Sequence, residues 1–471
     1  MEIKNVKGTH DILWGESSNY SQIETLLKSI TELFAYKEVR PPVLEHSELF
    51  VRGVGESSDI VRKEMYTFLD KGDRSLTLRP EFTAGIIRLI VQNKLYATNE
   101  LPLKCYYCGP VFRYERPQLG RYRQFNQFGV ESVGNDSPYN DVEVITMAYT
   151  MLCSLGLDNV KVKINTLGDE TSRENYKKAL KEFFSKHIEN MCEDCKQRYE
   201  LNPLRILDCK DEDDIKIIKD APKMSGYLSD ASKARFEVIL KALTNLGISY
   251  EIDEGLVRGL DYYSDTVFEF HYTSRENLNY GAIGAGGHYS KLVSEVGGPE
   301  MPGIGFSFGV ERLYSVLKDD KIISDEEEAL SIYVMPLDQN SFTYALNAAN
   351  ILRLSGYKTD VCFDQTKLGN MFKRAERKKA CFALIVGENE VKTNKVVVKN
   401  LSTQEQNEID LTNMTSYFDN IYNEHECSCQ HEEGECHCGG HHHHDEECEC
   451  GCGEGHHEGH CCCHDHDKEE R

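Results

Sequence analysis

Residues 112–131 read FRYERPQLGRYRQFNQFGVE, and their alternation predicts two strands, FRYE and RYRQFNQFGVE, joined by a tight turn at residues 116–120. Side chains of the second strand fall on two faces, with one face carrying Arg123, Phe125, Gln127, Gly129 and Glu131. A row of charged and amide groups between aromatic rings is costly if it is simply buried. The stretch is therefore either an exposed hairpin with a polar side or a sheet face that binds a polar ligand.

The chain as a whole has the composition of a globular protein of more than one domain. Its 471 residues are too many for one compact core, and two or three domains are expected. Apolar residues make up 40% and charged residues 28%. No apolar run is long enough to span a bilayer, and the start MEIKNVKGTHDILWGE lacks the apolar segment of a signal peptide. We expect a cytoplasmic protein with no membrane partner.

The last part of the chain, residues 424–471, differs from the rest in charge and in metal-binding side chains. It holds fifteen acidic and two basic residues, so about −11 of the net charge of −24 remains for the preceding residues. Ten of the 18 cysteines and twelve of the 17 histidines also lie there. The body is still acidic, so RNA contacts must depend on local basic patches. The eight body cysteines, in a chain of this size, suit a reducing compartment.

Four further stretches carry polar or glycine-rich patterns with ordinary local explanations. They are RPPVLEHSELF (40–50), LTLRPEFTAG (76–85), VRGLDYY (257–263) and GIGFSFGVER (303–312). The prolines of the first can simply end a strand. Glu81 and Thr83, at a predicted strand-to-helix turn, can be helix caps. The glycines of the last can merely permit close helix–strand packing.

Taken together and in this order, these motifs resemble those of class II aminoacyl-tRNA synthetases in the form found in histidyl-tRNA synthetases. FRxE followed by RYRQFxQ and a glutamate resembles motif 2, RPPVLEHSELF motif 1 and GIGFSFGVER motif 3, while VRGLDYY resembles a histidine-specific motif. The resemblance covers residues 1 to about 420. Two positions depart from the family pattern: Phe82 stands where glycine is usual, and His288-Tyr289-Ser290 replaces an Arg-Tyr-Asp triplet.

The resemblance implies an α+β fold and a homodimer with motif 1 at its interface. An antiparallel-sheet catalytic domain would span residues 1–325, with a helical insertion at about 169–250. The strand–helix alternation of residues 330–422 predicts an α/β domain, which in this family binds the anticodon stem-loop. Its predicted helix at residues 367–380 carries six basic side chains against one acid. Such a run is either a solvated face or a phosphate contact.

The resemblance also implies an ATP-dependent histidine–tRNA ligase with L-histidine, ATP (with Mg²⁺) and histidine tRNA as its substrates. By the family pattern, Glu131 and Tyr263 would pair with the two nitrogens of the imidazole ring. Glu81, Thr83 and Gln127 would bind the α-amino group, and Tyr262 would line the pocket. A pocket that hydrogen-bonds both ring nitrogens rejects apolar isosteres, because they leave its polar groups unpaired.

Arginines are expected at the ATP, because a planar and permanently charged fork holds phosphate and carboxylate in two-point contact. The resemblance assigns the α-phosphate to Arg113, the γ-phosphate to Arg312 and Arg121, and the space between histidine carboxylate and α-phosphate to Arg258. Arg258 and Arg113 would thus be catalytic. The resemblance implies two further ATP contacts, Phe125 (facing adenine) and Glu115. It also implies that Arg116 and Gln118 contact the extra 5′ guanosine of the tRNA.

Two sets of cysteines are candidates for metal ligands. Cys192, Cys195 and Cys209 in the predicted insertion are either a zinc site without an evident fourth ligand or small packing residues. In the tail, dense thiols and imidazoles suit Zn²⁺, Cu⁺ or Ni²⁺. Many four-ligand combinations are available there, and the tail candidates are Cys427, Cys429, Cys436, His437, Cys438, Cys448, Cys450, Cys452, Cys461, Cys462 and Cys463.

Two other functions compete with that of a synthetase. The regulatory subunit of ATP phosphoribosyltransferase resembles the catalytic core, but it lacks the anticodon domain and usually loses the ATP-binding arginines. The departures at Phe82 and Ser290 favour the regulatory subunit. The presence of all four ATP-site arginines argues against it; they are Arg113, Arg121, Arg258 and Arg312. A third hypothesis is a metal-binding module on an inactive synthetase body, which the tail favours and the intact motifs oppose.

Overall fold

The computed structural model describes residues 3–98, 100–116, 120–276, 279–325, 329–364 and 366–427. The chain divides into two compact units, Met1–Glu328 and Ala329–Arg471. The division lies at the end of the acidic stretch 319–328 that precedes the predicted α/β domain. The tail candidates lie outside the described residues, except for Cys427, whose backbone ends the last helix.

The first unit is built on an eight-stranded sheet with the order β1-β5-β6-β11-β10-β9-β7-β8. The neighbours from β5 to β7 are antiparallel, whereas β1 pairs with β5 and β8 pairs with β7 in parallel. In that order the strands are Lys37–Glu38, Leu103–Phe112, Gln124–Val133, Gly303–Gly309, Asn279–Tyr289, Ser264–Thr273, Val160–Thr166 and Tyr250–Ile252. The predicted antiparallel catalytic sheet is confirmed, with a parallel strand at each edge.

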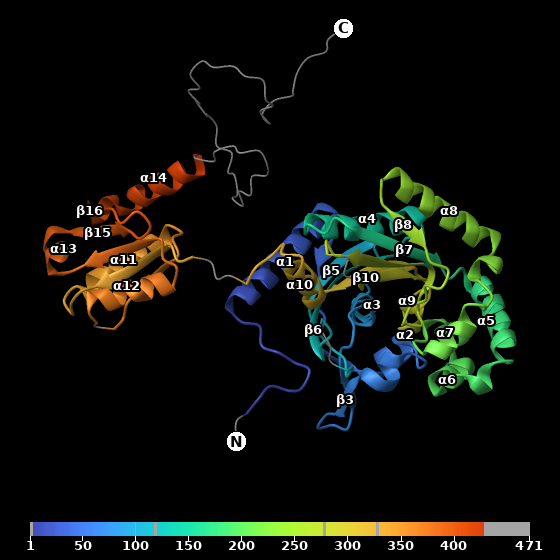
Figure 1. Ribbon diagram of the computed structural model, residues 1–471. Helices are drawn as coiled ribbons and strands as arrows, with labels where there is room; N and C mark the ends of the chain where they lie inside the picture. Colours follow the sequence, from blue (N-terminus) through green and yellow to red (C-terminus); the bar gives the residue numbers. More distant parts are fainter. Residues whose placement is uncertain are drawn as a thin grey trace, which may run out of the picture. The chain divides into compact units, whose positions relative to one another are not determined.

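Helices cover the two faces of this sheet differently (Figure 1). Four helices bury apolar side chains in a common core with one face: α1 (Trp14–Leu33), α4 (Pro138–Ser154), α8 (Asp230–Asn245) and α10 (Val310–Asp319). Ile23, Leu27 and Ile30 of α1 recur at helical spacing and are buried. On the other face lie α3 (Thr83–Gln92) and the short α9 (Leu292–Glu295). They cover only part of that face, which leaves room for a cavity.

The elements that precede α3 form a small subassembly beside the main sheet. Its antiparallel three-stranded sheet has the order β2-β4-β3, with strands Leu44–His46, Ser75–Leu78 and Tyr66–Leu69. Two helical segments, α2 (Ser47–Val54) and the π-helical η1 (Ile60–Glu64), pack near it. The chain from β4 into α3 therefore brings the LRPEFT stretch to the uncovered sheet face.

The alternation predicted for the second strand of the opening stretch is confirmed in β6. Phe128 and Val130 are fully buried in the core with the four helices, while Gln127 and Glu131 face the opposite side. The predicted strand ends were wrong, because β5 stops at Phe112 and β6 begins at Gln124. Beyond those points one backbone bond still joins the two segments, from Arg113 N–H to the Arg123 carbonyl (2.9 Å). The other backbone bonds go elsewhere: Tyr114 N–H donates to the Glu64 carbonyl (2.7 Å) and Arg123 N–H to the Gly8 carbonyl (2.7 Å).

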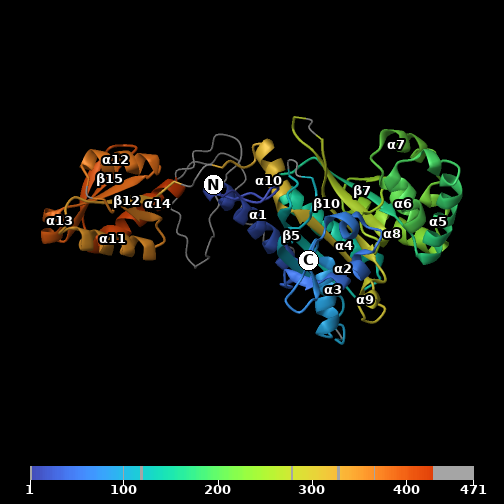
Figure 2. The ribbon, with the colours of Figure 1, turned by 90° about the horizontal axis from the view of Figure 1, so that it is seen from below.

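The predicted insertion is helical and has its own small apolar core (Figure 2). After β7 the chain forms α5 (Glu170–Phe184), α6 (Glu193–Leu201) and α7 (Glu212–Ile218) before returning through α8 to the main core. Three short 3₁₀ turns join them, η2 (Ile188–Asn190), η3 (Pro203–Asp208) and η4 (Met224–Gly226). Asp169 begins α5 by accepting a hydrogen bond from Ser172 N–H at 2.8 Å.

The second unit is an α/β domain, as its strand–helix alternation predicted. Its sheet has the order β13-β12-β14-β15-β16, with strands Thr359–Val361, Ile332–Pro336, Phe382–Val386, Lys395–Asn400 and Gln406–Asp410. Apolar side chains of α11 (Phe342–Leu354) and α14 (Met414–Cys427) pack on one face, and those of α12 (Leu368–Arg377) on the other. The remaining helices are α13 (Glu388–Thr393) and η5 (Leu411–Asn413). Within the described part of the chain, no helix is long and apolar enough to cross a membrane.

Candidate active site

A polar cavity of about 730 Å³ lies on the uncovered face of the main sheet. The residues predicted to bind histidine or ATP come from four separate stretches of sequence, and the fold brings all of them to this cavity. They are Glu81, Thr83, Arg113, Glu115, Arg121, Phe125, Gln127, Glu131, Arg258, Tyr262, Tyr263 and Arg312. Of the two predicted tRNA contacts, Arg116 is exposed and outside the lining, and Gln118 lies outside the described residues.

Glu131 forms the buried end of the cavity. Its carboxylate is 1% exposed and accepts hydrogen bonds from Thr83 Oγ1 (2.6 Å), Tyr289 Oη (2.9 Å) and Tyr107 Oη (3.4 Å). Burial raises the pKa of Glu131 to about 8, against the lowering effect of these hydroxyls. The carboxyl group is thus held firmly in place, in an environment that favours a cationic or hydrogen-donating ligand.

A glycine on the neighbouring strand leaves space for this carboxylate. A Cβ atom at Gly305 would lie 2.1 Å from Glu131 Oε2 and 2.4 Å from the Val130 carbonyl oxygen. Gly287 serves Tyr263 similarly, because a Cβ there would lie 2.7 Å from the tyrosine ring and 2.9 Å from the Thr266 carbonyl oxygen. The glycines of β10 and β11 therefore make room on the sheet surface for the polar and aromatic groups of the site.

Glu81 is both a helix cap and a cavity residue. Its two carboxylate oxygens accept from the backbone N–H groups of Thr83 (2.6 Å) and Ala84 (2.9 Å), at the start of α3. Burial raises its pKa, and these N–H groups act in the opposite direction. A carboxylate oxygen has a second lone pair, so capping leaves Glu81 able to accept from a ligand.

The departure at Phe82 is accommodated without blocking the cavity. Its backbone (φ −99°, ψ −32°) lies in the right-handed region that any residue adopts, so glycine is not required. The ring is buried and stacks on Tyr107 with centroids 4.3 Å apart, while the Arg79 guanidinium lies 3.8 Å from its centroid. Phe82 thus packs behind the site.

The triplet His288-Tyr289-Ser290 contributes a residue that the sequence analysis did not assign. Tyr289 donates to Glu131 and is buried in the cavity wall. His288 points to the other side of the sheet, where its Nδ1 lies 3.2 Å from Asp141 Oδ1. Arg235 of α8 reaches the same carboxylate at 3.0 Å. An arginine from the insertion therefore supplies a positive charge where the family triplet would supply its own.

Arg258 is held in the middle of the cavity by a second carboxylate. Its Nη1 lies 2.6 Å from Glu269 Oε1, and the other oxygen of Glu269 contacts His271 Nε2 at 2.9 Å. Burial alone would raise the pKa of Glu269, but the bonds from His271 and Arg258 outweigh it and the pKa is lowered. Arg258 Nε has no hydrogen-bond partner among the described residues. The sequence analysis did not predict Glu269 as a site residue. A signal was present, because Glu269 is a charged residue between two phenylalanines in the segment TVFEF (266–270).

Gln127 lines the cavity and has a hydrogen-bond acceptor without a partner in the residues that the structure describes. Its Nε2 donates to Ser307 Oγ at 2.8 Å, whereas its Oε1 is buried without a hydrogen-bond partner in the described part of the chain. A buried acceptor without a partner is costly, and a ligand that donates to it removes that cost. The arrangement suits an ammonium group.

The far end of the cavity is rich in arginine. Arg113 Nε donates to the Pro80 carbonyl (2.9 Å), and its guanidinium carbon lies 5.3 Å from the centroid of Phe125. Arg121 is half-exposed and lies 3.8 Å from Glu115. Arg312 donates to the Tyr280 carbonyl. The pKa of Arg312 is lowered mainly by burial and further by the positive charge of nearby Arg121. Two arginines this close, with Arg113 beside them, suit the binding of a polyanion.

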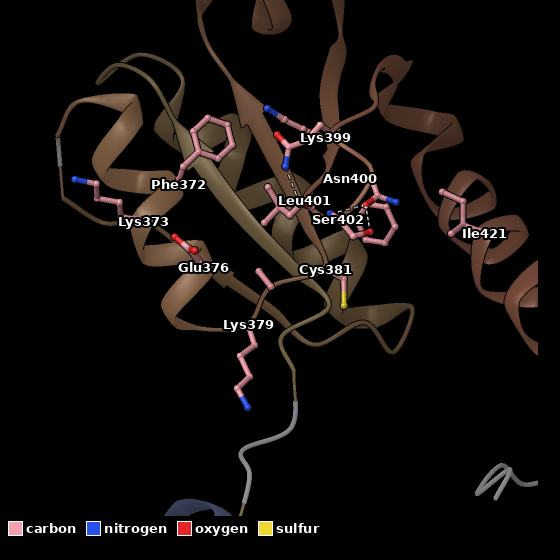
Figure 3. Close-up of a pocket in the computed structure, with 13 residues that line it drawn as sticks. Phe372, Lys373, Glu376, Lys379, Cys381, Lys399, Asn400, Leu401, Ser402 and Ile421 are labelled. Carbon is pink, nitrogen blue, oxygen red and sulfur yellow. Dashed lines mark hydrogen bonds between the residues drawn. The ribbon is translucent and has the colours of Figure 1, made fainter.

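The second unit has a basic surface of its own. A cavity of about 870 Å³ is lined by side chains from α12, β15 and α14, among them Lys373, Lys399, Asn400 and Ile421 (Figure 3). Lys399 Nζ lies 5.0 Å from the centroid of the Phe372 ring. On the same helix, Arg374 pairs with Asp364 (2.6 Å) and Lys378 with Asp360 (2.8 Å). The basic run is therefore partly neutralised, which leaves Lys367, Lys373 and Arg377 exposed.

Comparisons with known proteins agree with this geometry. A family model described as histidyl-tRNA synthetase matches residues 8–313, and one described as anticodon binding domain matches residues 331–421. The histidine–tRNA ligase of Bacillus subtilis (strain 168) is 46% identical over 408 residues, which cover 86% of this chain and 96% of the relative. That of Staphylococcus haemolyticus is 44% identical over 420 residues, covering 88% and 99%.

A solved structure leads to the same family. The crystal structure of apo S. aureus histidyl-tRNA synthetase has a TM-score of 0.75 and 38% sequence identity, and the match covers 88% of this chain and 100% of that one. The two family models end before residue 424, so neither of them includes the His- and Cys-rich tail. The chain belongs to the histidyl-tRNA synthetase family, whose members are ATP-dependent histidine–tRNA ligases.

Proposed function

We propose that this chain joins L-histidine to ATP as histidyl-adenylate, with release of pyrophosphate, and then transfers histidine to the 3′ end of histidine tRNA. One observation carries the proposal: a carboxylate pocket formed by Glu81 and Glu131 and a set of arginines line a single cavity. Histidine and AMP can be joined only if carboxylate and phosphate groups approach each other, and preorganised arginines offset their repulsion. The anticodon-domain match and the four arginines favour a synthetase over a regulatory subunit.

At the histidine end, Glu131 and the Tyr263 hydroxyl pair with the imidazole nitrogens. The α-ammonium group lies between Glu81, Gln127 Oε1 and Thr83, and Tyr262 closes the side of the pocket. At the ATP end, Arg113 contacts the α-phosphate, Arg312 and Arg121 the γ-phosphate, and Phe125 the adenine ring, with Glu115 beside them. ATP enters with its Mg²⁺ as the substrate. Catalysis consists of positioning and electrostatic stabilisation, with no covalent protein intermediate.

The direct test is ATP–pyrophosphate exchange with each of the twenty amino acids. We expect exchange with histidine alone, because the pocket pairs both ring nitrogens. No exchange with any amino acid, in a protein that binds ATP, would shift the assignment to a regulatory function.

Arg312 supplies a prediction that separates ATP binding from histidine binding. Arg312→Gln is expected to raise KM for ATP by about 10–100-fold, the effect of losing a charged hydrogen bond. KM for histidine should stay within about twofold, because Arg312 lies at the other end of the cavity. Steady-state exchange kinetics with each substrate varied in turn measures both values. An unchanged KM for ATP would remove Arg312 from the phosphate site.

Recognition of tRNA involves both units. Arg116 and Gln118 read the extra 5′ guanosine, and the second unit binds the anticodon stem-loop with α12 as a phosphate contact.

The enzyme acts in the cytoplasm as a homodimer with RPPVLEHSELF at the interface. Leu44 in this stretch and Phe68 and Leu69 in the same small sheet are 44–65% exposed, which is unusual for apolar side chains gathered on one sheet. Sedimentation equilibrium distinguishes a dimer from a monomer.

The tail from residue 424 is proposed to bind Zn²⁺, Cu⁺ or Ni²⁺ apart from catalysis. Its composition supports this assignment, since it combines thiols, imidazoles and carboxylates with no apolar periodicity. Deleting residues 425–471 should leave the rate of tRNA charging within about twofold of the rate of the full chain in the same buffer, and should remove most of the bound metal. Loss of charging by the truncated chain would show that the tail belongs to the fold.

A further inference from the structure

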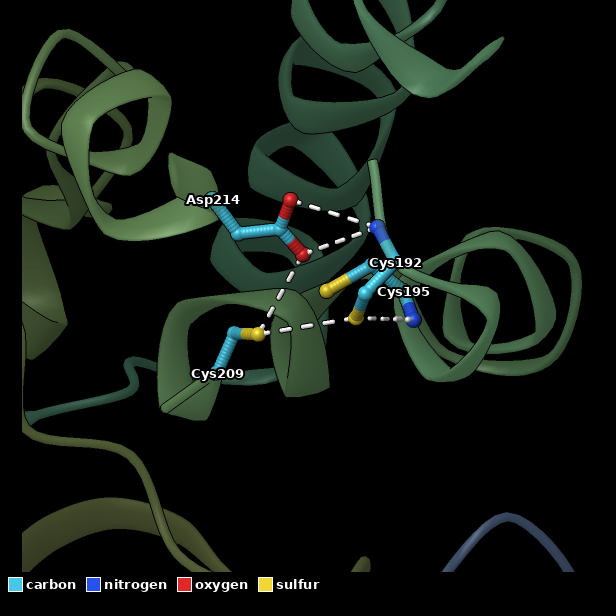
Figure 4. Close-up of side chains that lie close together, drawn as sticks. All are labelled: Cys192, Cys195, Cys209 and Asp214. Atoms are coloured by element: carbon cyan, nitrogen blue, oxygen red, sulfur yellow. Dashed lines mark hydrogen bonds between the residues drawn. The ribbon is translucent and has the colours of Figure 1, made fainter. Parts of the chain in front are cut away.

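Four potential metal ligands meet in the insertion, and none of them lines the cavity of the candidate active site. Cys192 is the N-cap residue of α6, Cys195 lies in the first turn of that helix, Cys209 directly follows η3, and Asp214 lies in α7 (Figure 4). One ligand atom from each residue lies within 4.8 Å of all the others. The sequence showed three thiols without a fourth ligand, and the fold supplies that ligand as the Asp214 carboxylate.

The distances fit a tetrahedral ion better than a disulfide. Ligands about 2.3 Å from a tetrahedral zinc ion lie about 3.8 Å from one another, whereas bonded sulfur atoms are about 2.05 Å apart. Cys192 Sγ and Cys209 Sγ are 3.8 Å apart. Cys209 Sγ and Asp214 Oδ2 are 3.3 Å apart, close to the roughly 3.5 Å expected for a sulfur and an oxygen ligand.

The surroundings of the cluster are those of metal-bound thiolates. Cys195 N–H points at Cys192 Sγ and Asp211 N–H at Cys209 Sγ, each at 3.4 Å, while Cys192 N–H contacts both Asp214 oxygens at 3.2 Å. Such second contacts orient ligands and offset their negative charge. Apolar packing does not explain Asp214, because its carboxylate is 1% exposed among three thiols. The Cys192 N–H and the Cys209 thiol offset its charge only in part, and a bound cation would offset the rest.

We propose that Cys192, Cys195, Cys209 and Asp214 bind one Zn²⁺ ion that stabilises the insertion. Three sulfur ligands and one oxygen ligand in a tetrahedron select zinc over Mg²⁺ or Ca²⁺, which prefer six or more oxygens. All four positions are filled by protein side chains, so the ion has a structural role and no open position for catalysis. It ties α6, η3 and α7 together, three short elements with a small core of their own.

The same ion would hold a segment that supports the cavity. Between Cys195 and Cys209, Arg205 of η3 donates to the Arg258 carbonyl at 2.9 Å and pairs with Asp59 at 3.1 Å. Loss of zinc should therefore loosen the VRGLDYY stretch and raise KM for histidine. This consequence depends on the proposed histidine-binding function, whereas the metal site itself does not.

Thiol protection in the full chain tests the site independently of the tail, which would confuse a total metal count. The protein is alkylated after incubation with zinc or with a chelator, and peptide mass spectrometry measures labelling at Cys192, Cys195 and Cys209. We expect zinc to slow labelling of all three by at least about tenfold, because without the ion the insertion loosens and exposes Cys195 and Cys209, which are buried when it is folded. Exposed Cys153 and Cys381 should be labelled in both states, and Cys105, buried in the catalytic core, in neither.

Asp214→Asn provides the decisive variant, because it keeps the shape of the side chain. It should raise the zinc concentration for half-maximal protection by at least about tenfold, while Asp213→Asn, at an exposed carboxylate in the same turn of α7, should not change it. Labelling of the three thiols at equal rates with zinc and with chelator would show that they only pack. Labelling that requires a reductant would show a disulfide. Either result overturns the zinc site, and a failure of histidine exchange alone would not affect it.

Discussion

Replacing Glu131 with glutamine is expected to lower kcat/KM for histidine in ATP–pyrophosphate exchange by about 10²–10³-fold. The carboxylate is fixed by Thr83, Tyr289 and Tyr107, so it cannot move to compensate, and the amide that replaces it presents an N–H₂ group to the same donors. KM for ATP should change little, because the arginines lie at the other end of the cavity. Glu388→Gln, at an exposed carboxylate on α13 of the second unit, is the matched control.

The same substitution is expected to stabilise the ligand-free protein in a pH-dependent way. The pKa of Glu131 rises from 4.5 to about 8 on folding, so the unfolded chain releases this proton first as the pH increases. The free energy of unfolding of the wild-type protein therefore decreases between pH 4.5 and 8. The glutamine variant has no carboxyl group at this position, so its stability does not show this decrease. The Tm advantage of Glu131→Gln should grow from pH 5 to pH 8 and then level off. A difference that is independent of pH would mean that burial does not perturb this carboxyl group.

Arg258 is the second position with a large expected effect. Both Arg258→Gln and Arg258→Lys should lower kcat by about 10²–10³-fold, the usual loss when a preorganised group that stabilises developing charge is removed. Lysine is not sufficient, because it cannot hold a carboxylate and a phosphate in fixed two-point geometry. Glu269 orients the Arg258 guanidinium through a hydrogen bond of 2.6 Å.

Single-turnover formation of histidyl-adenylate measures this effect without product release. Arg275→Gln, at an exposed arginine that lies 3.6 Å from Asp158, controls for the loss of a surface charge and should keep full activity. The two Arg258 variants should also retain cooperative thermal unfolding, since His271 still contacts Glu269. Near-normal kcat in Arg258→Lys would show that a simple positive charge is enough at this position.

Local sequence patterns predicted the floor of the cavity well. The period of two in residues 124–133 placed Gln127 and Glu131 opposite Phe128 and Val130, because successive side chains of a strand alternate by backbone geometry alone. The resemblance to a known family then connected stretches that local patterns could not relate to each other.

Residues whose importance depends on long-range contacts were missed. Tyr289 reaches Glu131 across 158 positions, and Glu269 becomes a cavity residue only when it meets Arg258. The strand ends at Phe112 and Gln124 were misplaced for the same reason, since segments around Gly8 and Glu64 take the backbone hydrogen bonds. By sequence, Phe82 was only a departure from the family pattern. The structure shows that its ring packs between Tyr107 and Arg79 and leaves the cavity open.

By itself, the sequence determined the order of the elements, the polar face of β6 and the residue types of the site, because these follow from local periodicity and side-chain chemistry. The tertiary structure alone decided which distant groups meet: the hydroxyls around Glu131, the Arg258–Glu269 pair and the carboxylate of Asp214 beside three thiols. The reason is physical. Hydrogen bonds and metal coordination depend on distances of a few ångströms, and packing of the whole chain sets those distances.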